Sequence, residues 1–260
     1  MRGGTRSPLG VDGPRGRRAV VLLGGTMDEL PLLRAARLAG ELHGASVQLR
    51  WTAGSETSAA RPLIRELALD AGLAELSAAA FRSLLDQGRV NTVMLAPTLW
   101  HRLAGTLWRR LHHASVYICR QASLPPASVL CCADSDATAA GLLDRLAEGL
   151  PTRPTRCTVL RALPPLSPWI MGMLAVAGWA VPADDAGTPG FASVAGIRQL
   201  VIRAPAAEAA AAACSAARTN LLVLGWHQHA LPLPERWLHP TAWRLSTSVP
   251  GDVLLVPLDA

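Results

Sequence analysis

The sequence predicts an α/β protein built from two tandem open sheets, each with five parallel strands and with helices on both faces. Short apolar runs alternate with segments of helical periodicity along the chain, a pattern typical of strands buried in parallel sheets. Hydrophobic residues make up 50% of the chain but aromatic residues only 4%, which favours helices packed closely on a sheet. The same order of elements then begins again after a proline-bearing segment, which indicates an internal duplication.

Composition divides the chain into four segments. Residues 1–17 are rich in Arg, Gly and Pro, and we expect a disordered tail that is solvated rather than bound to nucleic acid. Residues 18–120 are the first predicted domain, residues 121–127 (QASLPPA) the linker, and residues 128–260 the second domain. The formal charge is +6 and every basic residue is Arg. These arginines are mixed with acids and form no basic stripe interleaved with aromatics, so we expect no nucleic-acid surface.

Each domain is predicted to alternate strands with helices. In the first domain, the helix after the opening strand ends at Gly44. The other expected elements of that domain are strands at 19–23, 45–51, 73–77, 92–96 and 116–119 and helices at 59–71, 79–87 and 104–112. The second domain is expected to hold strands at 129–133, 157–160, 199–202, 221–224 and 253–256 and helices at 137–150, 167–181, 206–218 and 241–248. Such alternation implies right-handed crossovers and a parallel sheet in each half.

One apolar segment tests whether the chain enters a membrane. Residues 169–181 (WIMGMLAVAGWAV) are apolar nearly all round, but a helix needs about 20 apolar residues to span a bilayer. We therefore expect a core helix or a helix at an interface, and no transmembrane segment. Residues 1–18 lack the apolar core of a signal peptide.

The cysteines indicate a reducing compartment. There are five, with no CxxC pair; four lie in apolar strand-like runs and one in an alanine-rich helix: Cys119, Cys131, Cys132, Cys157 and Cys214. Buried reduced thiols fit this placement, so we expect a cytoplasmic protein. A redox role for the adjacent Cys131 and Cys132 is the less favoured alternative, because buried thiols are inert.

Several segments together resemble a known family, the universal stress proteins, in a tandem form. The segments are AVVLLGGT (19–26), NTVMLAP (91–97), HHASVYICR (112–120), SVLCCADSD (128–136), APAAEAAAAACSAARTNLLVLGW (204–226) and GDVLLVP (251–257). The resemblance implies two Rossmann-like domains, similar to those of the adenine nucleotide alpha hydrolases. We expect the two domains to dock through their last strands.

The resemblance also implies what an ATP site would need. Members that bind ATP carry an Asp after the first strand and a Gly-x2-Gly-x9-Gly-Ser/Thr loop. In the second copy Asp134 and Gly225 match, whereas Gln228 replaces the second glycine and residues 239–241 (His-Pro-Thr) replace the last pair. A proline removes a backbone N–H that could hold a phosphate, and a side chain keeps the backbone away from it.

The first copy keeps a different fragment of this motif. Ala96 and Leu99 stand where the loop glycines would be, and Gly24 stands at the place of the Asp. Only Gly105 and Thr106 remain, and we expect them at a helix N-terminus, as a phosphate site or as an ordinary cap.

A residual nucleotide site in the second copy would combine several of these residues. Asp134 would contact adenine, Gly225 would approach the phosphates, and Thr241 and Arg236 would bind them. Two structural roles compete: Asp134 as a helix cap and Gly225 as a tight turn. The histidines near this loop lie in no zinc pattern, and we expect no metal.

These patterns predict a non-enzymatic regulatory or binding protein that acts through an unknown protein partner, without a cofactor. A homodimer is a further alternative for its assembly. The second function class is a stress sensor that binds ATP at the residual site. A third is an enzyme such as a slow ATPase, although no nucleophile elbow and no Asp–His pairing support catalysis.

Overall fold

The structure, a computed structural model, has the α/β fold that the sequence predicts. It describes residues 18–24, 29–43, 46–52, 74–86, 90–107, 114–122, 126–133, 135–149, 156–163, 173, 176, 197–203, 205–227 and 241–258. The first half contains β1 (Arg18–Leu23), α1 (Leu30–His43), β2 (Ser46–Thr52), β3 (Ala74–Leu76), α3 (Ala78–Asp86), β4 (Thr92–Leu95), α4 (Pro97–Leu107) and β5 (Ser115–Ile118). The second half contains β6 (Ser128–Ala133), α5 (Asp136–Gly149), β7 (Arg156–Leu163), β8 (Ile197–Arg203), α7 (Ala206–Ala217), β9 (Leu221–His227), α8 (Thr241–Ser248) and β10 (Asp252–Leu258).

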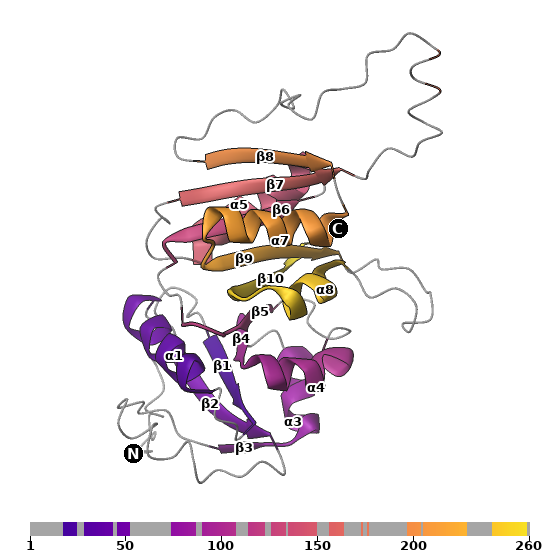
Figure 1. Cartoon of the computed structure of the whole chain (residues 1–260). Helices are drawn as coiled ribbons and strands as arrows, with labels where there is room; N and C mark the ends of the chain where they lie inside the picture. Colours follow the sequence, from indigo (N-terminus) through magenta and orange to yellow (C-terminus); the bar gives the residue numbers. More distant parts are fainter. Residues whose placement is uncertain are drawn as a thin grey trace, which may run out of the picture.

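All the strands in the described part of the chain belong to one sheet of ten strands, in the order β3-β2-β1-β4-β5-β10-β9-β6-β7-β8 (Figure 1). The prediction of two separate sheets is therefore wrong. Within each half the strands are parallel and follow the same order, and only the pairing of β5 with β10 is antiparallel. The sheets merge because each half ends in an edge strand whose N–H and C=O groups need partners. The expected docking through the last strands is confirmed.

Helices cover both faces of this sheet. On one face, α1 and α5 bury side chains such as Leu32 and Leu142 against the strands. On the other face, α3, α4, α7 and α8 bury side chains such as Phe81 and Leu245. We call these the α1/α5 face and the α4/α8 face. Alternate residues of each strand point to opposite faces, as Leu222 and Val223 of β9 do.

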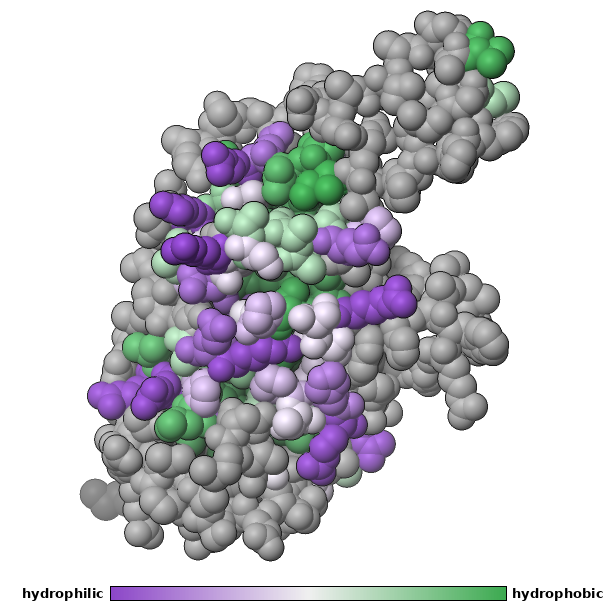
Figure 2. All heavy atoms as spheres, viewed as in Figure 1, coloured by the Kyte–Doolittle hydropathy of each residue, from purple (hydrophilic) through white to green (hydrophobic). Residues whose placement is uncertain are grey.

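The alanine-rich helix α7 lies close to the sheet because its inward residues are small. Ala209, Ala210 and Ala213 are buried on the α4/α8 face. Figure 2 shows the pale, weakly hydrophobic surface of this helix and a group of strongly apolar residues at the level of β8. Leu200 of β8 belongs to the exposed apolar surface, with 37% of its side chain open to solvent. Among the described residues, no helix is long and apolar enough to cross a membrane.

Two expectations about elements change. Helix α4 begins at Pro97 instead of residue 104, because proline fits the first turn of a helix, where its missing N–H has no partner to lose. Strand β9 continues past Gly225 to His227, since Trp226 and His227 still pair with β10. The helices expected at 59–71 and 167–181 lie outside the described residues, apart from positions 173 and 176.

A buried polar cluster joins the two halves at the β5–β10 pair. The carboxylate of Asp252, fully buried, accepts hydrogen bonds from the Tyr117 hydroxyl at 2.6 Å and from the backbone N–H groups of Arg120 and Gln121 at 2.6 and 2.7 Å. The Arg120 guanidinium donates to the carbonyl oxygens of Gly251 and Ser246 at 3.0 and 2.6 Å. Every one of these bonds connects the end of the first half to the end of the second.

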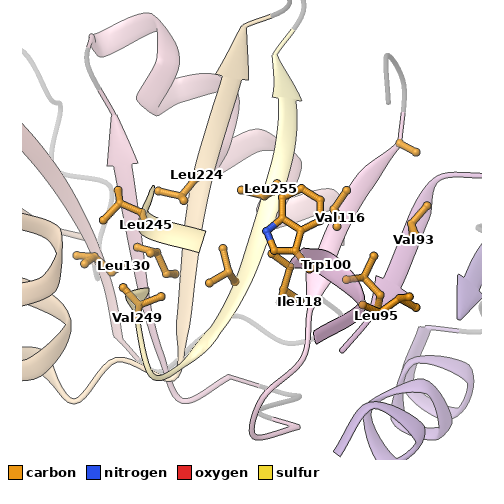
Figure 3. Packing of buried hydrophobic residues seen from close by; sticks show 14 of the residues in the cluster. Val93, Leu95, Trp100, Val116, Ile118, Leu130, Leu224, Leu245, Val249 and Leu255 are labelled. Atoms are coloured by element: carbon orange, nitrogen blue, oxygen red, sulfur yellow. The ribbon is translucent and has the colours of Figure 1, made fainter. Parts of the chain in front are cut away.

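An apolar core continues across the same junction. The indole of Trp100, from α4, is fully buried and lies near Leu255, Val116 and Ile118 (Figure 3). Its Nε1–H donates to the hydroxyl oxygen of Ser246, on α8, at 3.0 Å. A tryptophan of the first half is thus held by a serine of the second.

Candidate functional site

The strand order places one candidate site in each half. In an open α/β sheet, ligands bind outside the carboxyl ends of the strands, where the strand order reverses. In the first half the order reverses between β1 and β4, and in the second half between β6 and β9. The residues that follow or end these strands are therefore the ones to compare with the sequence predictions.

Among the described residues, protein side chains lie at the switch point of the first half. Helix α4 begins two residues after β4 ends, so no loop separates the strand from the helix. The Leu99 side chain is only 1% exposed, and its Cδ1 lies 3.5 Å from where a Cβ on Gly24 would stand. Leu99 replaces the second glycine of the expected loop, and its side chain occupies the space beside the end of β1. That Leu99 obstructs a nucleotide at this place stays a prediction.

A buried carboxylate that the sequence analysis missed also lies at the end of β1. Glu29 is 1% exposed, and its Oε1 accepts a hydrogen bond from the Gly24 backbone N–H. The N–H at the end of β1 is therefore bonded within the protein. The available signal for this contact is an acidic residue shortly after Gly24 and Gly25. The family pattern does not point to Glu29, because in that pattern the acidic residue directly follows the strand.

Gly105 and Thr106 do not lie at a helix N-terminus, and this expectation is wrong. They fall in the last turn of α4, which begins at Pro97. At a rise of about 1.5 Å per residue, Gly105 is roughly 12 Å along the helix from its first residue. The first turn, where free N–H groups could bind a phosphate, consists of other residues.

In the second half, Ser135 caps the helix that follows β6. The Ser135 hydroxyl accepts a hydrogen bond from the Thr138 backbone N–H at 3.2 Å and lies 2.9 Å from the Thr138 hydroxyl. This is the arrangement of a helix N-cap, so α5 is capped without Asp134. Asp134 and Arg236 lie outside the described residues. Asp136, the first residue of α5, forms an ion pair with Arg161 of β7 at 3.2 Å.

Gly225 has a packing role that neither sequence interpretation included. It lies inside β9, opposite Val256, so it forms no turn. A Cβ at this position would stand 2.3 Å from Cδ1 of Leu258 and 3.5 Å from Cδ2 of Leu142. The missing side chain makes room for Leu258, on the α1/α5 face. Packing of protein side chains therefore explains this glycine.

Thr241 and Gly225 belong to different parts of the second half. Thr241 is the first residue of α8, and this helix buries Leu245 and Val249 on the α4/α8 face. The space that a side chain at Gly225 would need lies on the opposite face. Residues 228–240, which connect β9 to α8 and include Arg236, are outside the described part of the chain.

The remaining titratable groups show no metal site among the described residues, where no three His, Cys, Asp or Glu side chains come together. At the junction, burial and then the charge of Asp252 raise the pKa of Tyr117 well above its ordinary value. The phenol therefore stays protonated and remains a hydrogen-bond donor to Asp252.

No protein-family model and no curated protein matches the sequence. Solved structures do match: the fold is that of the universal stress proteins. One such protein, from Archaeoglobus fulgidus DSM 4304, is 10% identical, and the alignment covers 92% of this chain and 96% of that one with a TM-score of 0.60.

Two structures from Pseudomonas aeruginosa are similar to the same extent. A functionally unknown protein from strain PAO1 is 15% identical over 93% of this chain and 92% of its own, with a TM-score of 0.56. A candidate universal stress protein from strain UCBPP-PA14 is 16% identical over 93% of both chains, again with a TM-score of 0.56. These alignments extend over both halves of the chain.

Proposed function

We propose that this chain is a non-enzymatic regulatory protein of the universal stress protein type, which acts in the cytoplasm by binding a protein partner. The observation that carries the proposal is the packing of protein side chains at the switch point of the first half. There Leu99 packs beside Gly24, and Glu29 accepts the N–H that ends β1. A nucleotide needs open space and free N–H groups at this place, and both contacts oppose its binding in the first half.

Two features of the second half, the packing of Gly225 and the proline at position 240, support the same proposal. Gly225, the residue that most resembles the family's phosphate loop, is accounted for by the packing of Leu258. Position 240 is a proline, which supplies no N–H to a phosphate. We infer that the partner surface, and not a bound nucleotide, carries the function.

A nucleotide-binding sensor is the second candidate, and one difference between the halves favours it. Strand β4 leads into α4 almost at once, whereas residues 228–240 separate β9 from α8. This connection is long enough to form a loop. A site there would use Asp134 for adenine and Arg236 with Thr241 for the phosphates. ATP would then be the ligand.

Equilibrium binding of labelled ATP distinguishes the two candidates. We expect no saturable binding at micromolar concentrations to the wild-type chain, and the same result for Asp134→Ala. Saturable binding that Asp134→Ala abolishes would establish the sensor and exclude our first proposal. Multiple-turnover release of phosphate from ATP would be required to support an ATPase.

A further inference from the structure

Strand β8 is one outer edge of the sheet, and it is long. All seven of its residues pair with β7, and no described strand pairs with its other side (Figure 1). The opposite edge, β3, has only three residues. Proteins blunt sheet edges with short strands or with proline, because unpaired N–H and C=O groups attract a further strand. β3 is short, whereas β8 is neither short nor interrupted by proline.

The side chains of β8 offer apolar surface on both faces of the sheet. Arg198, Gln199 and Leu200 are exposed, Leu200 to 37%. Ile202 packs against the core of the α4/α8 face and Ile197 against that of the α1/α5 face. Because alternate residues of a strand point to opposite faces, Leu200 lies on the same face as Ile202. Figure 2 shows strongly apolar residues gathered at the level of β8.

The charges of this edge indicate which kind of strand it attracts. All the charged residues of β7 and β8 are arginines: Arg156, Arg161, Arg198 and Arg203. Arg161 forms the ion pair with Asp136, whereas Arg156 and Arg198 are exposed. A second copy of the chain brings the same positive charges, and like charges disfavour pairing. A strand with acidic residues is attracted instead.

Single-stranded nucleic acid is also negatively charged, but it fits this edge less well. Proteins that bind it stack its bases on aromatic side chains, and neither β7 nor β8 contains an aromatic residue. An extended polypeptide, in contrast, uses the main-chain groups of a sheet edge directly. The charge and the backbone of β8 therefore favour an acidic peptide segment.

We propose that β8 is the docking edge for an extended acidic segment of the protein partner, which adds to the sheet as an antiparallel strand. This inference rests on the proposed function, in which a protein partner carries the activity. The β5–β10 pair is the precedent within the chain, because it joins two edge strands in antiparallel orientation. Main-chain hydrogen bonds supply affinity, and side chains supply specificity. Acidic residues lie opposite positions 198 and 203, and apolar residues lie opposite Leu200 and Ile202.

The test uses the full chain and a synthetic peptide, EVTVTEV, joined to a fluorophore by a Gly-Ser linker. Antiparallel to β8, this peptide places glutamate opposite positions 198 and 203 and valine opposite Leu200 and Ile202. Fluorescence anisotropy should show saturable binding at micromolar concentrations. Hydrogen exchange with mass spectrometry should show that the peptide protects the backbone amides of residues 197–203.

Two control peptides separate the contributions of charge and backbone. KVTVTKV reverses the charge, and we expect it to bind at least about tenfold more weakly, because like charges across an interface are costly. EVPPTEV lacks two adjacent N–H groups, one of which faces β8 because these groups alternate between the two sides of a strand. It should also bind at least about tenfold more weakly, since proline cannot donate to a strand ladder.

Variants of the chain locate the site. Arg198→Glu reverses the charge of an exposed residue, and we expect it to weaken binding of EVTVTEV at least about tenfold and to strengthen binding of KVTVTKV. The matched control is Arg102→Glu, the same change at an exposed residue of α4 in the first half. Its affinity for EVTVTEV should stay within about twofold of wild type, because salt screens distant surface charges. Circular dichroism and urea midpoints check that both variants fold.

Several results would overturn the proposal. They are no saturable binding of EVTVTEV, binding that leaves residues 197–203 unprotected, or equal effects of Arg198→Glu and Arg102→Glu. A dimer in sedimentation velocity that Leu200→Asp dissociates would assign β8 to a second copy. Tighter binding of a single-stranded oligothymidylate than of EVTVTEV would assign the edge to nucleic acid. Failure of the peptide to bind leaves the proposed function standing, because saturable binding of ATP is the result that contradicts that function.

Discussion

Gly225 matches a glycine in the family's loop pattern, but in this structure packing determines its role. The resemblance marks it as the first glycine of a phosphate loop, but in the structure Leu258 fills the space that a side chain would need. Gly141 of α5 belongs to the same contact, because a Cβ there would lie 3.4 Å from the other methyl carbon of Leu258. Two glycines and one leucine therefore fit together between α5 and the sheet.

This fit predicts that Gly225→Ala destabilises the chain. The new methyl group would stand 2.3 Å from Leu258 Cδ1, and overpacking of a core costs about 1–3 kcal/mol. In the double variant with Leu258→Ala, the additional cost of Gly225→Ala should largely disappear. Urea denaturation of the four proteins in this cycle measures both effects. The account would be contradicted by an unchanged urea midpoint for Gly225→Ala, or by an undiminished cost of Gly225→Ala in the Leu258→Ala background. Either result would show that packing against Leu258 is not the reason for a glycine at position 225.

At the scale of elements, the pairing of β5 with β10 is where the two halves become one sheet. Asp252 stands at the start of β10 and satisfies donors from the end of β5 and from the residues after it. Tyr117 is buried and Arg120 is half-buried, so loss of the carboxylate would leave their O–H and N–H groups without this acceptor. An unsatisfied buried group costs about 1–3 kcal/mol.

We therefore expect Asp252→Ala to lower the free energy of unfolding by about 3 kcal/mol or more. The matched control is Tyr117→Phe, which removes only one of the donors, with an expected loss of about 1 kcal/mol. Chemical denaturation provides both values. If Asp252→Ala were no more damaging than Tyr117→Phe, the carboxylate would not be the centre of the junction.

The pKa of Tyr117 gives this junction a dependence on alkaline pH. Because the pKa of Tyr117 is raised in the folded chain, the unfolded chain loses the phenolic proton first, at the ordinary pKa of 10.0. Above that pH the unfolded state binds fewer protons than the folded state, so stability falls, by up to about 1.4 kcal/mol per pH unit.

The effect is measured as the slope of unfolding free energy against pH between about 9.5 and 11. Tyr117→Phe lacks the phenol, so its slope should be flatter than that of the wild-type chain. Identical slopes would show that the tyrosine is not held protonated by burial beside Asp252.

For the whole molecule, the sequence was sufficient to predict the class of fold and the parallel strands of each half, because both follow from local apolar runs and from crossover handedness. It did not predict a single sheet, since the β5–β10 contact joins residues far apart in the chain. A pair such as Tyr117 and Leu254 has no local signal. The boundary errors have a similar origin: Pro97 and Gly225 were interpreted as loop residues, whereas tertiary pairing and helix geometry include them in regular elements.

The candidate sites were predictable only in part. The loss of the loop glycines was visible, and the structure places the Leu99 side chain beside Gly24 at the end of β1. The role of Glu29 was not visible, because its carboxylate reaches back to Gly24 only after the chain has turned from β1 into α1. No rule of residue spacing predicts the contact between Glu29 and Gly24, because it depends on how the chain folds in three dimensions.

Native mass spectrometry of the full chain, purified gently and then mixed with ATP, tests the central claim most directly. Because Leu99 and Glu29 occupy the switch point of the first half, we predict the mass of the unliganded protein, with no nucleotide carried through purification and none retained at micromolar ATP. A stoichiometric adenosine nucleotide on the wild-type chain that survives Asp134→Ala would place a ligand in the half that we describe as closed, and would contradict the account.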